Sequence, residues 1–293
     1  MAAASALPAP KLVAVLNVTP DSFSDGGQLA DLQSVVQRGL QCAAEGADLL
    51  DVGGESTRPG AQEVSELEEL RRVVPAVTAL VASQPLPVWV DTRRAAVAMA
   101  VLAAGASGIN DVSGFADPDM AGVIAQAGVP WVLMHMPHAV GHMRASAAVE
   151  TMPQGVAAGV ERVVADLQVA VERALACRVS RDQLVIDPGV GFGKTTAQNA
   201  ALCAVPAALR GLGLPVYIGP SRKSFLAQLG PAGAGLPPAE RTWGTAAAVT
   251  AAVLGGAAYV RVHDVAAMRL VVEAATAMHR ALQEASQHDA QSP

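Results

Sequence analysis

The sequence has few aromatic residues, few cysteines and no excess of positive charge. Aromatic side chains make up 3% of the 293 residues and hydrophobic side chains 52%, so we expect a core of Ala, Val and Leu, as in helices packed closely on a parallel sheet. The cysteines, Cys42, Cys177 and Cys203, form no C-x-x-C pair, which argues against structural zinc and favours a reducing compartment. The formal net charge of −6 argues against a general nucleic-acid binder.

Signals for export or membrane insertion are also missing. The first ten residues, MAAASALPAP, contain no basic residue, and the apolar stretch after them is too short for a signal peptide, so we predict a cytoplasmic protein. The longest uncharged run, residues 243–260, is mostly Ala and contains Gly255 and Gly256. We interpret it as a buried helix, a glycine stop and the start of a strand.

The stretch LVIDPGVGFGKT, residues 184–195, indicates a buried strand that ends at Asp187 and runs into a glycine-rich turn. A phosphate-binding P-loop needs a glycine where Pro188 stands, and the dinucleotide fingerprint needs a glycine where Lys194 stands, so neither motif is present. Such a turn lets backbone N–H groups approach a ligand closely. Taken alone, Asp187 could equally cap the following helix.

The same pattern of a buried strand, a polar strand end and a helix recurs along the chain. Predicted strands cover residues 11–18, 48–53, 87–92, 108–111, 131–136, 184–187, 215–219 and 259–262. Predicted helices cover about 32–45, 66–80, 94–104, 118–126, 156–175, 198–210, 241–255 and 265–284. Eight alternating units predict an α/β fold, a (β/α)8 TIM barrel in a single domain at residues 11–285, with a flexible leader at 1–10 and a flexible tail at 286–293. A doubly wound open sheet is the alternative.

Polar groups mark the predicted strand ends, which meet at one rim of such a barrel. They are Asn17, Asp51, Asp91, Asn110, His135, Asp187, Ser221, Arg222, Lys223, Arg261, His263 and Asp264. Any one of them could be a helix cap or a satisfied structural group. It is unfavourable for all of them to be structural groups at a rim that binds no ligand, because buried charges without partners are costly.

These rim residues suggest two tasks. Asp91, Asn110 and Asp187 offer acceptors and an amide that suit a flat heterocycle with several NH donors. The cations Arg58, Arg222, Lys223, Arg261 and His263 suit an anion such as a diphosphate. Asn17 can offer Mg²⁺ a neutral oxygen while phosphate and water supply the other ligands. The combination outlines a transferase with a phosphorylated leaving group.

At this point eight segments together resemble the bacterial dihydropteroate synthases. The segments are LNVTPDSFSDGG (16–27), DVGGESTRPGA (51–61), DT (91–92), IND (109–111), MHM (134–136), DPGVGFGKT (187–195), GPSRKSF (219–225) and RVHDV (261–265). The resemblance implies that 6-hydroxymethyl-7,8-dihydropterin diphosphate condenses with 4-aminobenzoate to give 7,8-dihydropteroate and pyrophosphate in folate biosynthesis. It also implies that the protein uses Mg²⁺ as a cofactor, is a target of sulfonamides and forms a homodimer through the last helices.

The resemblance also assigns residues. Pterin contacts fall on Asp91, Asn110, Asp187 and Lys223, diphosphate contacts on Thr57, Arg261 and His263, and Mg²⁺ on Asn17. Contacts to 4-aminobenzoate fall on Phe23, Arg58, Pro59, Phe192 and Ser224. The residues expected to act in catalysis are Asp91, Asp187, Lys223 and Arg261, in a reaction that begins with ionisation of the diphosphate.

One segment departs from the family pattern, and two other functions compete. After MHM the chain reads PHAVGHMRAS where the family has a glycine and a proline at short spacing, so contacts in that loop are open. A methyltetrahydrofolate-corrinoid methyltransferase would leave SRKSF and RVHDV unexplained. A catalytically silent pterin-binding paralogue would be favoured by loss of Asn17, Arg261 or His263, and all three are present.

Overall fold

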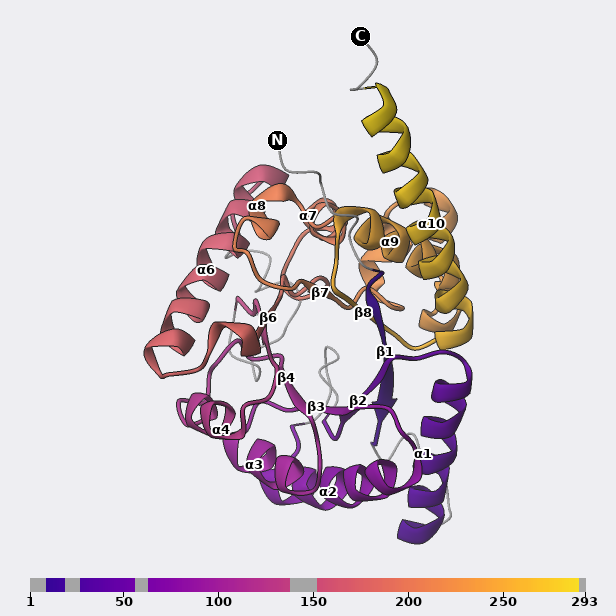
Figure 1. Ribbon diagram of the computed structural model, residues 1–293. Coiled ribbons are helices and arrows are strands. Elements are labelled where there is room, and N and C mark those ends of the chain that lie inside the picture. The colour runs from indigo at the N-terminus through magenta and orange to yellow at the C-terminus, as the bar shows by residue number, and fades with distance from the viewer. Residues whose placement is uncertain (1–8, 19–26, 56–62, 138–151, 290–293) are drawn as a thin grey trace.

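The computed structural model describes residues 9–18, 27–55, 63–137 and 152–289. Within these residues eight strands alternate with helices around a central axis (Figure 1). The strands are β1 (Lys11–Asn17), β2 (Leu49–Gly53), β3 (Val88–Asp91), β4 (Gly108–Asp111), β5 (Trp131–Met134), β6 (Leu184–Asp187), β7 (Tyr217–Ile218) and β8 (Tyr259–Val262). The helices are α1 (Gly27–Ala44), α2 (Glu66–Ser83), α3 (Ala95–Ala103), α4 (Met120–Ala127), α6 (Val156–Ala176), α7 (Thr196–Cys203), α8 (Ala207–Arg210), α9 (Thr242–Gly255) and α10 (Val265–Asp289). Short 3-10 helices are η3 (Arg181–Gln183), η4 (Ser224–Gln228), η5 (Pro231–Gly233) and η6 (Pro238–Glu240).

The strands close into the predicted barrel. Every pairing is parallel, in the order β6-β5-β4-β3-β2-β1-β8-β7. The circle closes between β6 and β7, where Ile186 bridges Val216 and the Ile186 N–H donates to the Pro215 carbonyl at 3.0 Å. The chain is therefore a single (β/α)8 barrel, and an open doubly wound sheet is excluded.

The core has two parts because successive strand residues point to opposite sides of the sheet. The larger part, which includes Leu12, Leu50 and Val90, lies between the strands and the surrounding helices. The smaller part fills the inside of the barrel with Val13, Leu49, Trp89, Val132, Val185 and Tyr217, against which Tyr259 packs. Three of the scarce aromatic residues, Trp89, Tyr217 and Tyr259, thus lie inside the barrel, with the rings of Trp89 and Tyr259 5.3 Å apart.

Several helix ends follow from local chemistry. Ser65 caps α2, since its hydroxyl accepts from the Glu68 N–H at 3.3 Å. The helix in the uncharged run ends at Gly256, whose φ of 85° is left-handed, and β8 follows. The single helix predicted for residues 198–210 is wrong: α7 stops at Cys203 and α8 starts at Ala207, because Pro206 disfavours helical geometry in the residue before it.

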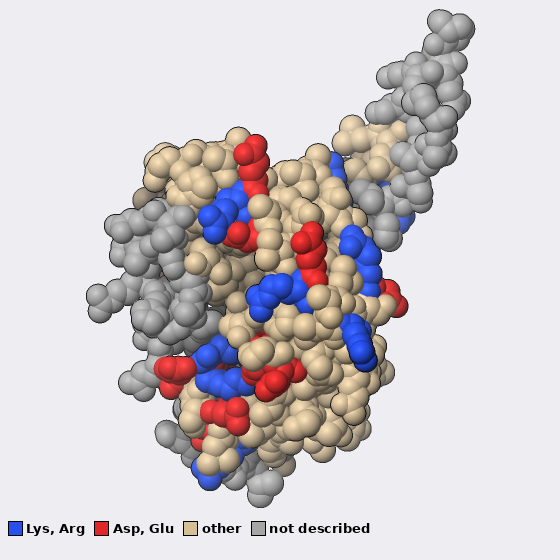
Figure 2. All heavy atoms as spheres, turned by 90° about the vertical axis from the view of Figure 1, so that its left-hand side faces the viewer, with Lys and Arg blue, Asp and Glu red and all other residues tan. Residues whose placement is uncertain are grey.

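The ends of the barrel domain remain a prediction. Residues 1–8 lie outside the described residues, and α10 continues to Asp289, into the range expected for the tail. No helix in the described part of the chain has the length and apolar character that crossing a membrane requires. On the face that carries α6, basic and acidic side chains are interspersed (Figure 2).

Candidate active site

The register of the parallel strands brings the predicted polar strand ends together at one rim. Asn17 of β1 lies opposite Gly53 of β2, and Gly53 lies opposite Asp91 of β3. Asp91 is in turn the ladder partner of Asn110 in β4. A Cβ placed on Gly53 would lie 3.7 Å from both the Asn17 Oδ1 and the Asp91 Cβ. Strands β1, β3 and β4, within a run of four adjacent strands, thus present an amide, a carboxylate and a second amide at the same rim.

A cavity of about 320 Å³ opens at this rim. Its lining includes every described residue that the sequence assigned to the site: Asn17, Asp91, Asn110, Asp187, Phe192, Lys223, Ser224, Arg261 and His263. Val15, Glu55, Val112, Met134, Gly191, Tyr217, Gly219, Ser221, Arg222, Pro238 and Arg241 complete it. Four predicted site residues, Phe23, Thr57, Arg58 and Pro59, lie outside the described residues.

Arg261 joins two carboxylates on the floor of the site. Its Nε lies 2.5 Å from Asp51 Oδ2 and its terminal nitrogen lies 3.1 Å from Asp91 Oδ2. Burial opposes the charge of Arg261, but Asp51, Tyr217 and Asp91 raise its pKa overall. Burial raises the pKa of Asp91 to about 8, although the Arg261 guanidinium opposes this shift. One guanidinium therefore serves two acids, and Asp91 holds its proton more tightly than an exposed aspartate.

Asp187 ends β6 and organises the glycine-rich turn after it. Its Oδ1 accepts from the Gly189 N–H at 2.7 Å. Gly189 has a φ of 65°, and a Cβ there would lie 2.2 Å from the His135 carbonyl oxygen. Only glycine fits that position. Burial raises the pKa of Asp187, while Lys223 opposes the shift.

Lys223, in the segment after β7, reaches the glycine-rich turn that follows the adjacent strand β6. Its Nζ donates to the Val190 carbonyl and lies 4.4 Å from the centre of the Phe192 ring. Burial lowers the pKa of Lys223 to about 8, although Asp187 opposes the shift. Gly191, with a φ of 84°, leaves room for this side chain, since a Cβ there would lie 2.6 Å from the Lys223 Cδ.

The other lysine of the motif supports the turn from behind. Lys194 is 6% exposed, and its Nζ donates to the carbonyls of Gly189 at 2.9 Å and Phe192 at 3.0 Å. Burial lowers the pKa of Lys194 to about 7. In a phosphate-binding loop the lysine of this motif contacts phosphate. In GVGFGKT the Lys194 amine instead donates to backbone carbonyls and so stabilises the turn.

His263 and Ser221 meet on the side of β8. The Ser221 Oγ lies 3.0 Å from His263 Nδ1 and accepts from the His263 N–H at 3.2 Å. This geometry gives Ser221 a role in orienting the imidazole. Arg222, expected among the anion-binding cations, pairs with Asp264, with its Nε 3.1 Å from Asp264 Oδ2. That carboxylate offsets the charge of Arg222.

The prediction that His135 lies at the rim with the other strand ends is wrong. Its Nε2 lies 3.1 Å from Asp166 Oδ2 in α6, so the ring points to the helix layer. Burial lowers the pKa of His135 to about 3, and Lys194 adds to the shift. Its neighbour in sequence, Met134, lines the cavity instead, because consecutive strand residues face opposite sides.

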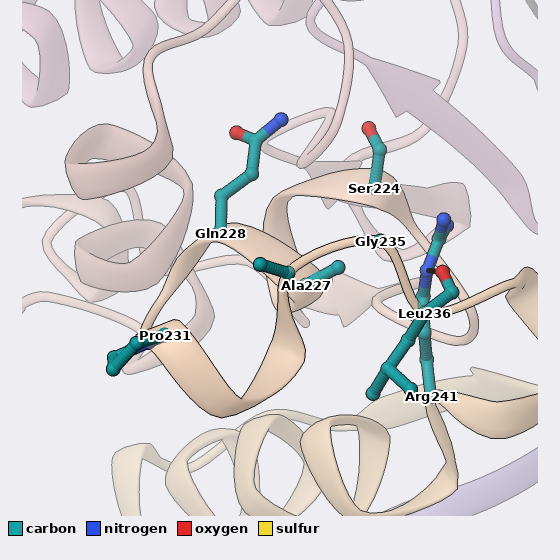
Figure 3. Close-up of a pocket in the computed structure, with 9 residues that line it drawn as sticks. Ser224, Ala227, Gln228, Pro231, Gly235, Leu236 and Arg241 are labelled. Atoms are coloured by element: carbon teal, nitrogen blue, oxygen red, sulfur yellow. Dashed lines mark hydrogen bonds between the residues drawn. The ribbon is translucent and has the colours of Figure 1, made fainter.

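A second hollow of about 680 Å³ adjoins the cavity at Ser224 and Arg241, which line both. Ser224, Ala227 and Gln228 of η4 lie across from Gly235 and Leu236 of the following loop (Figure 3). Arg241 runs beside Leu236, and its Nε donates to the Leu236 carbonyl at 2.9 Å. The rim thus continues outward from Ser224 into a largely apolar groove.

The donor set at the rim suits a cation that arrives with an anionic substrate. No cluster of three or more His, Cys, Asp or Glu with metal-binding geometry occurs among the described residues. Asn17 is half-buried, lines the cavity and carries a neutral oxygen, which is a ligand that Mg²⁺ accepts. One amide oxygen fits a Mg²⁺ that obtains its remaining ligands from phosphate and water.

Some residues at the cavity have no role that the sequence predicts. Asp51 is recognisable only as a strand end, and no sequence pattern points to Tyr217, Glu55 or Arg241. Tyr217 and Asp51 are separated by 166 residues, yet the Tyr217 hydroxyl lies 3.3 Å from Asp51 Oδ2. Only their alternation along β2 and β7, which turns both side chains into the barrel, could have signalled this contact.

Comparison with known proteins places the site in a family context. The family model for pterin binding enzymes matches residues 13–263. A dihydropteroate synthase of Mycobacterium leprae is 47% identical over 267 residues, covering 88% of this chain and 89% of that protein. A structure of the Xanthomonas albilineans dihydropteroate synthase with 4-aminobenzoic acid is 43% identical with a TM-score of 0.82, covering 92% and 93% of the two chains. The Yersinia pestis enzyme, solved with a sulfonamide drug, is 38% identical with a TM-score of 0.82, covering 93% and 94%.

Proposed function

The chain belongs to the dihydropteroate synthases of the pterin binding enzyme family, and from this premise we propose how its rim residues carry out the reaction. The enzyme is a transferase of folate biosynthesis. It condenses 6-hydroxymethyl-7,8-dihydropterin diphosphate with 4-aminobenzoate to give 7,8-dihydropteroate and pyrophosphate. The observation that carries the residue assignments is that Asp91, Asn110, Asp187, Lys223 and Arg261 line one cavity.

The pterin ring binds among the strand ends of β3, β4 and β6. Asp91, Asn110 and Asp187 are each less than a tenth exposed and offer oxygens to ring NH groups, while Lys223 offers a donor. Substrate donors compensate the buried acceptors, whose desolvation is costly in the free protein. The floor of the cavity therefore selects a flat heterocycle with several hydrogen-bonding edges.

The diphosphate binds toward β8 and β1. Arg261 and His263 offer positive charge and N–H donors there, and Thr57 is expected to contribute from the loop after β2. Asn17 is the residue that would hold Mg²⁺, which when bound neutralises negative charge on the diphosphate oxygens. Arg222 lines the same cavity and is paired with Asp264.

The aromatic acid binds on the open side of the pterin. Phe192 and Ser224 line that part of the cavity, and Phe23, Arg58 and Pro59 are expected to approach from the loops. Lys223, which lies over the Phe192 ring, separates this side from the pterin floor. Sulfonamides share the shape and charge distribution of 4-aminobenzoate and are expected to compete at this subsite.

The reaction proceeds by ionisation of the substrate. The bond between the methylene carbon and the diphosphate oxygen breaks, its electron pair leaves with pyrophosphate, and positive charge spreads over the pterin. The amine of 4-aminobenzoate then attacks the methylene carbon and loses a proton. Arg261 and His263 stabilise the leaving group, and Asp91 and Asp187 stabilise the cation.

Pyrophosphate release from the purified protein tests the proposal. The protein receives the pterin diphosphate, Mg²⁺ and 4-aminobenzoate, and each component is omitted in turn. We expect release coupled to dihydropteroate formation only with all three components. Release without 4-aminobenzoate would indicate hydrolysis, and full activity with a chelator would withdraw Asn17 as a metal ligand.

A homodimer in the cytoplasm is the form in which we expect the enzyme to act. One face of α10 presents apolar side chains at helical spacing: Leu270, Ala274, Ala277, Met278, Ala281 and Leu282, all exposed. Leu270, Met278 and Leu282 are 69%, 64% and 62% exposed, which is unusual for large apolar residues and supports contact with a second copy. The unpaired state of Cys42, Cys177 and Cys203 suits a reducing compartment.

A further inference from the structure

Asp51 lies behind the lining of the pterin cavity and gathers three of its lining residues. The side chain is fully buried in β2. Its Oδ2 accepts from Arg261 Nε at 2.5 Å, from Asn110 Nδ2 at 3.0 Å and from the Tyr217 hydroxyl at 3.3 Å. Arg261, Asn110 and Tyr217 all line the cavity and come from different strands. One carboxylate oxygen therefore connects β2 with β4, β7 and β8.

The contact with Asp51 fixes which way the Asn110 amide points. A carboxylate paired with a guanidinium has acceptors only, so the Asn110 atom that faces it must be the NH₂ group. Asn110 Oδ1 is then the other end of the amide. It is buried and has no hydrogen-bond partner among the described residues. An acceptor in that state is costly unless a ligand or water supplies a donor.

We propose that Asp51 is a positioning residue that sets the hydrogen-bonding polarity of the pterin site, by holding Asn110 so that its oxygen reads an NH donor of the ring. The proposal rests on the proposed function and deepens it. A site with the amide reversed would present NH₂ to the ring and favour a heterocycle with an acceptor at that edge. Asp51 thereby determines which class of heterocycle, amino-substituted or oxo-substituted, the cavity accepts.

The variant Asp51→Val tests this role. Valine has no acceptor, so the Asn110 NH₂ group loses the contact that orients the amide, which is then free to reverse. Asp51→Asn would not test it, because Arg261 Nε can only donate and would keep the amide oxygen where it still accepts from Asn110. The ligands are 6-hydroxymethylpterin and its 2-oxo analogue, in which an acceptor replaces the 2-amino donor. Neither carries the diphosphate that Arg261 is expected to bind. Isothermal titration calorimetry with each ligand gives a ratio of affinities, which a general loss of stability does not change.

We expect the wild-type protein to prefer the amino ligand by about 10-fold or more, as for a site built to accept one hydrogen bond. In D51V the affinity for the amino ligand falls by about 10- to 100-fold, and the preference disappears. The double variant D51V/N110D restores the acceptor, because a carboxylate at position 110 presents an oxygen to the ring in either orientation. Its preference should return toward the wild-type ratio.

Asp48→Val is the matched control. Asp48 directly precedes β2 and accepts from Arg269 and from the Leu12 N–H, each at 2.6 Å, at the opposite end of the barrel from the cavity. This variant loses an acid from an arginine pair, as D51V does. We expect a lower melting temperature in D48V and an unchanged ratio of ligand affinities.

An unchanged ratio in folded D51V, or a ratio in the double variant as low as in D51V, overturns the proposal. If D51V does not fold, the double variant is measured instead, and loss of the amino preference there also overturns the proposal. Pyrophosphate release is measured in parallel. A wild-type protein that binds the ring but releases no pyrophosphate contradicts the reaction, while the affinity ratio still decides the role of Asp51.

Discussion

At the scale of single residues, the site depends on a few positions that tolerate only one type of residue. Gly189 turns the chain directly after Asp187 and lies against the His135 carbonyl. Asp91 is a buried acid that shares one guanidinium with Asp51. For each of these two positions, a substitution should change the free energy of unfolding by a measurable amount.

Gly189→Ala should destabilise the protein by about 1–3 kcal/mol or more, because a Cβ in this left-handed position lies 2.2 Å from a backbone oxygen. Gly122→Ala is the control: Gly122 is exposed inside α4, with no atom within 4 Å of an added Cβ. That change should stabilise by up to about 1 kcal/mol. Urea unfolding of both variants measures the difference, and equal effects would show that the turn is not constrained as described.

The stability of the free protein should depend on the protonation of Asp91. Burial raises its pKa from 3.8 to about 8, so the folded state binds this proton more tightly than the unfolded chain does. The resulting stabilisation is complete below about pH 4 and is lost as the pH rises through about 8. Asp91→Asn removes this dependence.

The measurement compares urea unfolding of wild type and Asp91→Asn at about pH 5, 7 and 9. The free energy of unfolding of the variant should gain relative to the wild type as the pH increases. A difference that is constant with pH, or that moves the other way, would contradict the raised pKa. The same variant is expected to bind the pterin ring more weakly.

At the scale of secondary-structure elements, the start of α3 connects the cavity wall to the helix layer. Arg94 contacts Glu69 of α2, and its guanidinium lies 3.0 Å from Glu55, which lines the cavity. It also donates to the Val64 carbonyl at 2.6 Å. Glu69 is 1% exposed, and burial raises its pKa, with Thr92 and Arg94 opposing. One arginine thus joins α2, α3 and the segment after β2.

Arg94→Met should cost about 3–5 kcal/mol of stability, because it leaves the Glu69 carboxylate buried without its partner. The double change Arg94→Met/Glu69→Met should recover much of that loss. As a control, Arg162→Met removes an exposed pair with Asp166 on α6 and should cost less than about 1 kcal/mol. Additive losses in the double variant would mean that the two side chains do not act as a pair.

At the scale of the whole molecule, closure of the barrel and the position of α10 decide what the surface offers. Strand β7 has only two residues, yet Val216 before it bridges to β6 and so completes the circle. The last helix, α10, packs along α9 and extends outward beyond the barrel (Figure 1). Its exposed apolar face is the part of this surface that we propose is covered by a second copy.

A change of Leu270 and Met278 to Glu should convert the dimer to a monomer, because charged groups in an apolar interface are not compensated. Met99→Glu, at a residue 61% exposed on α3, is the control and should leave the assembly unchanged. Sedimentation velocity gives the oligomeric state of each variant. A monomeric wild type would withdraw the proposed interface.

Much of the site could be read from strand ends in the sequence. Asp91, Asn110, Asp187 and Lys223 line one cavity, because the geometry of a parallel barrel brings all its carboxyl ends to one rim, and their roles in binding stay predictions. His135 was misplaced because a one-residue difference in a strand reverses the direction of the side chain. The single helix predicted for residues 198–210 is wrong because it passes over Pro206, which disfavours helical geometry in the residue before it.

The sequence by itself determined the fold class, the rim and the family, since these depend on periodicity and on motifs that are local in the chain. Tertiary structure alone decided which charges neutralise one another. Arg261 lies against Asp51 and Asp91, 210 and 170 residues away, and Arg222 against Asp264. Such contacts depend on the register of strands that are distant in sequence. They also depend on burial, which determines how an amide is oriented and whether an acid keeps its proton. No single segment of the chain contains this information.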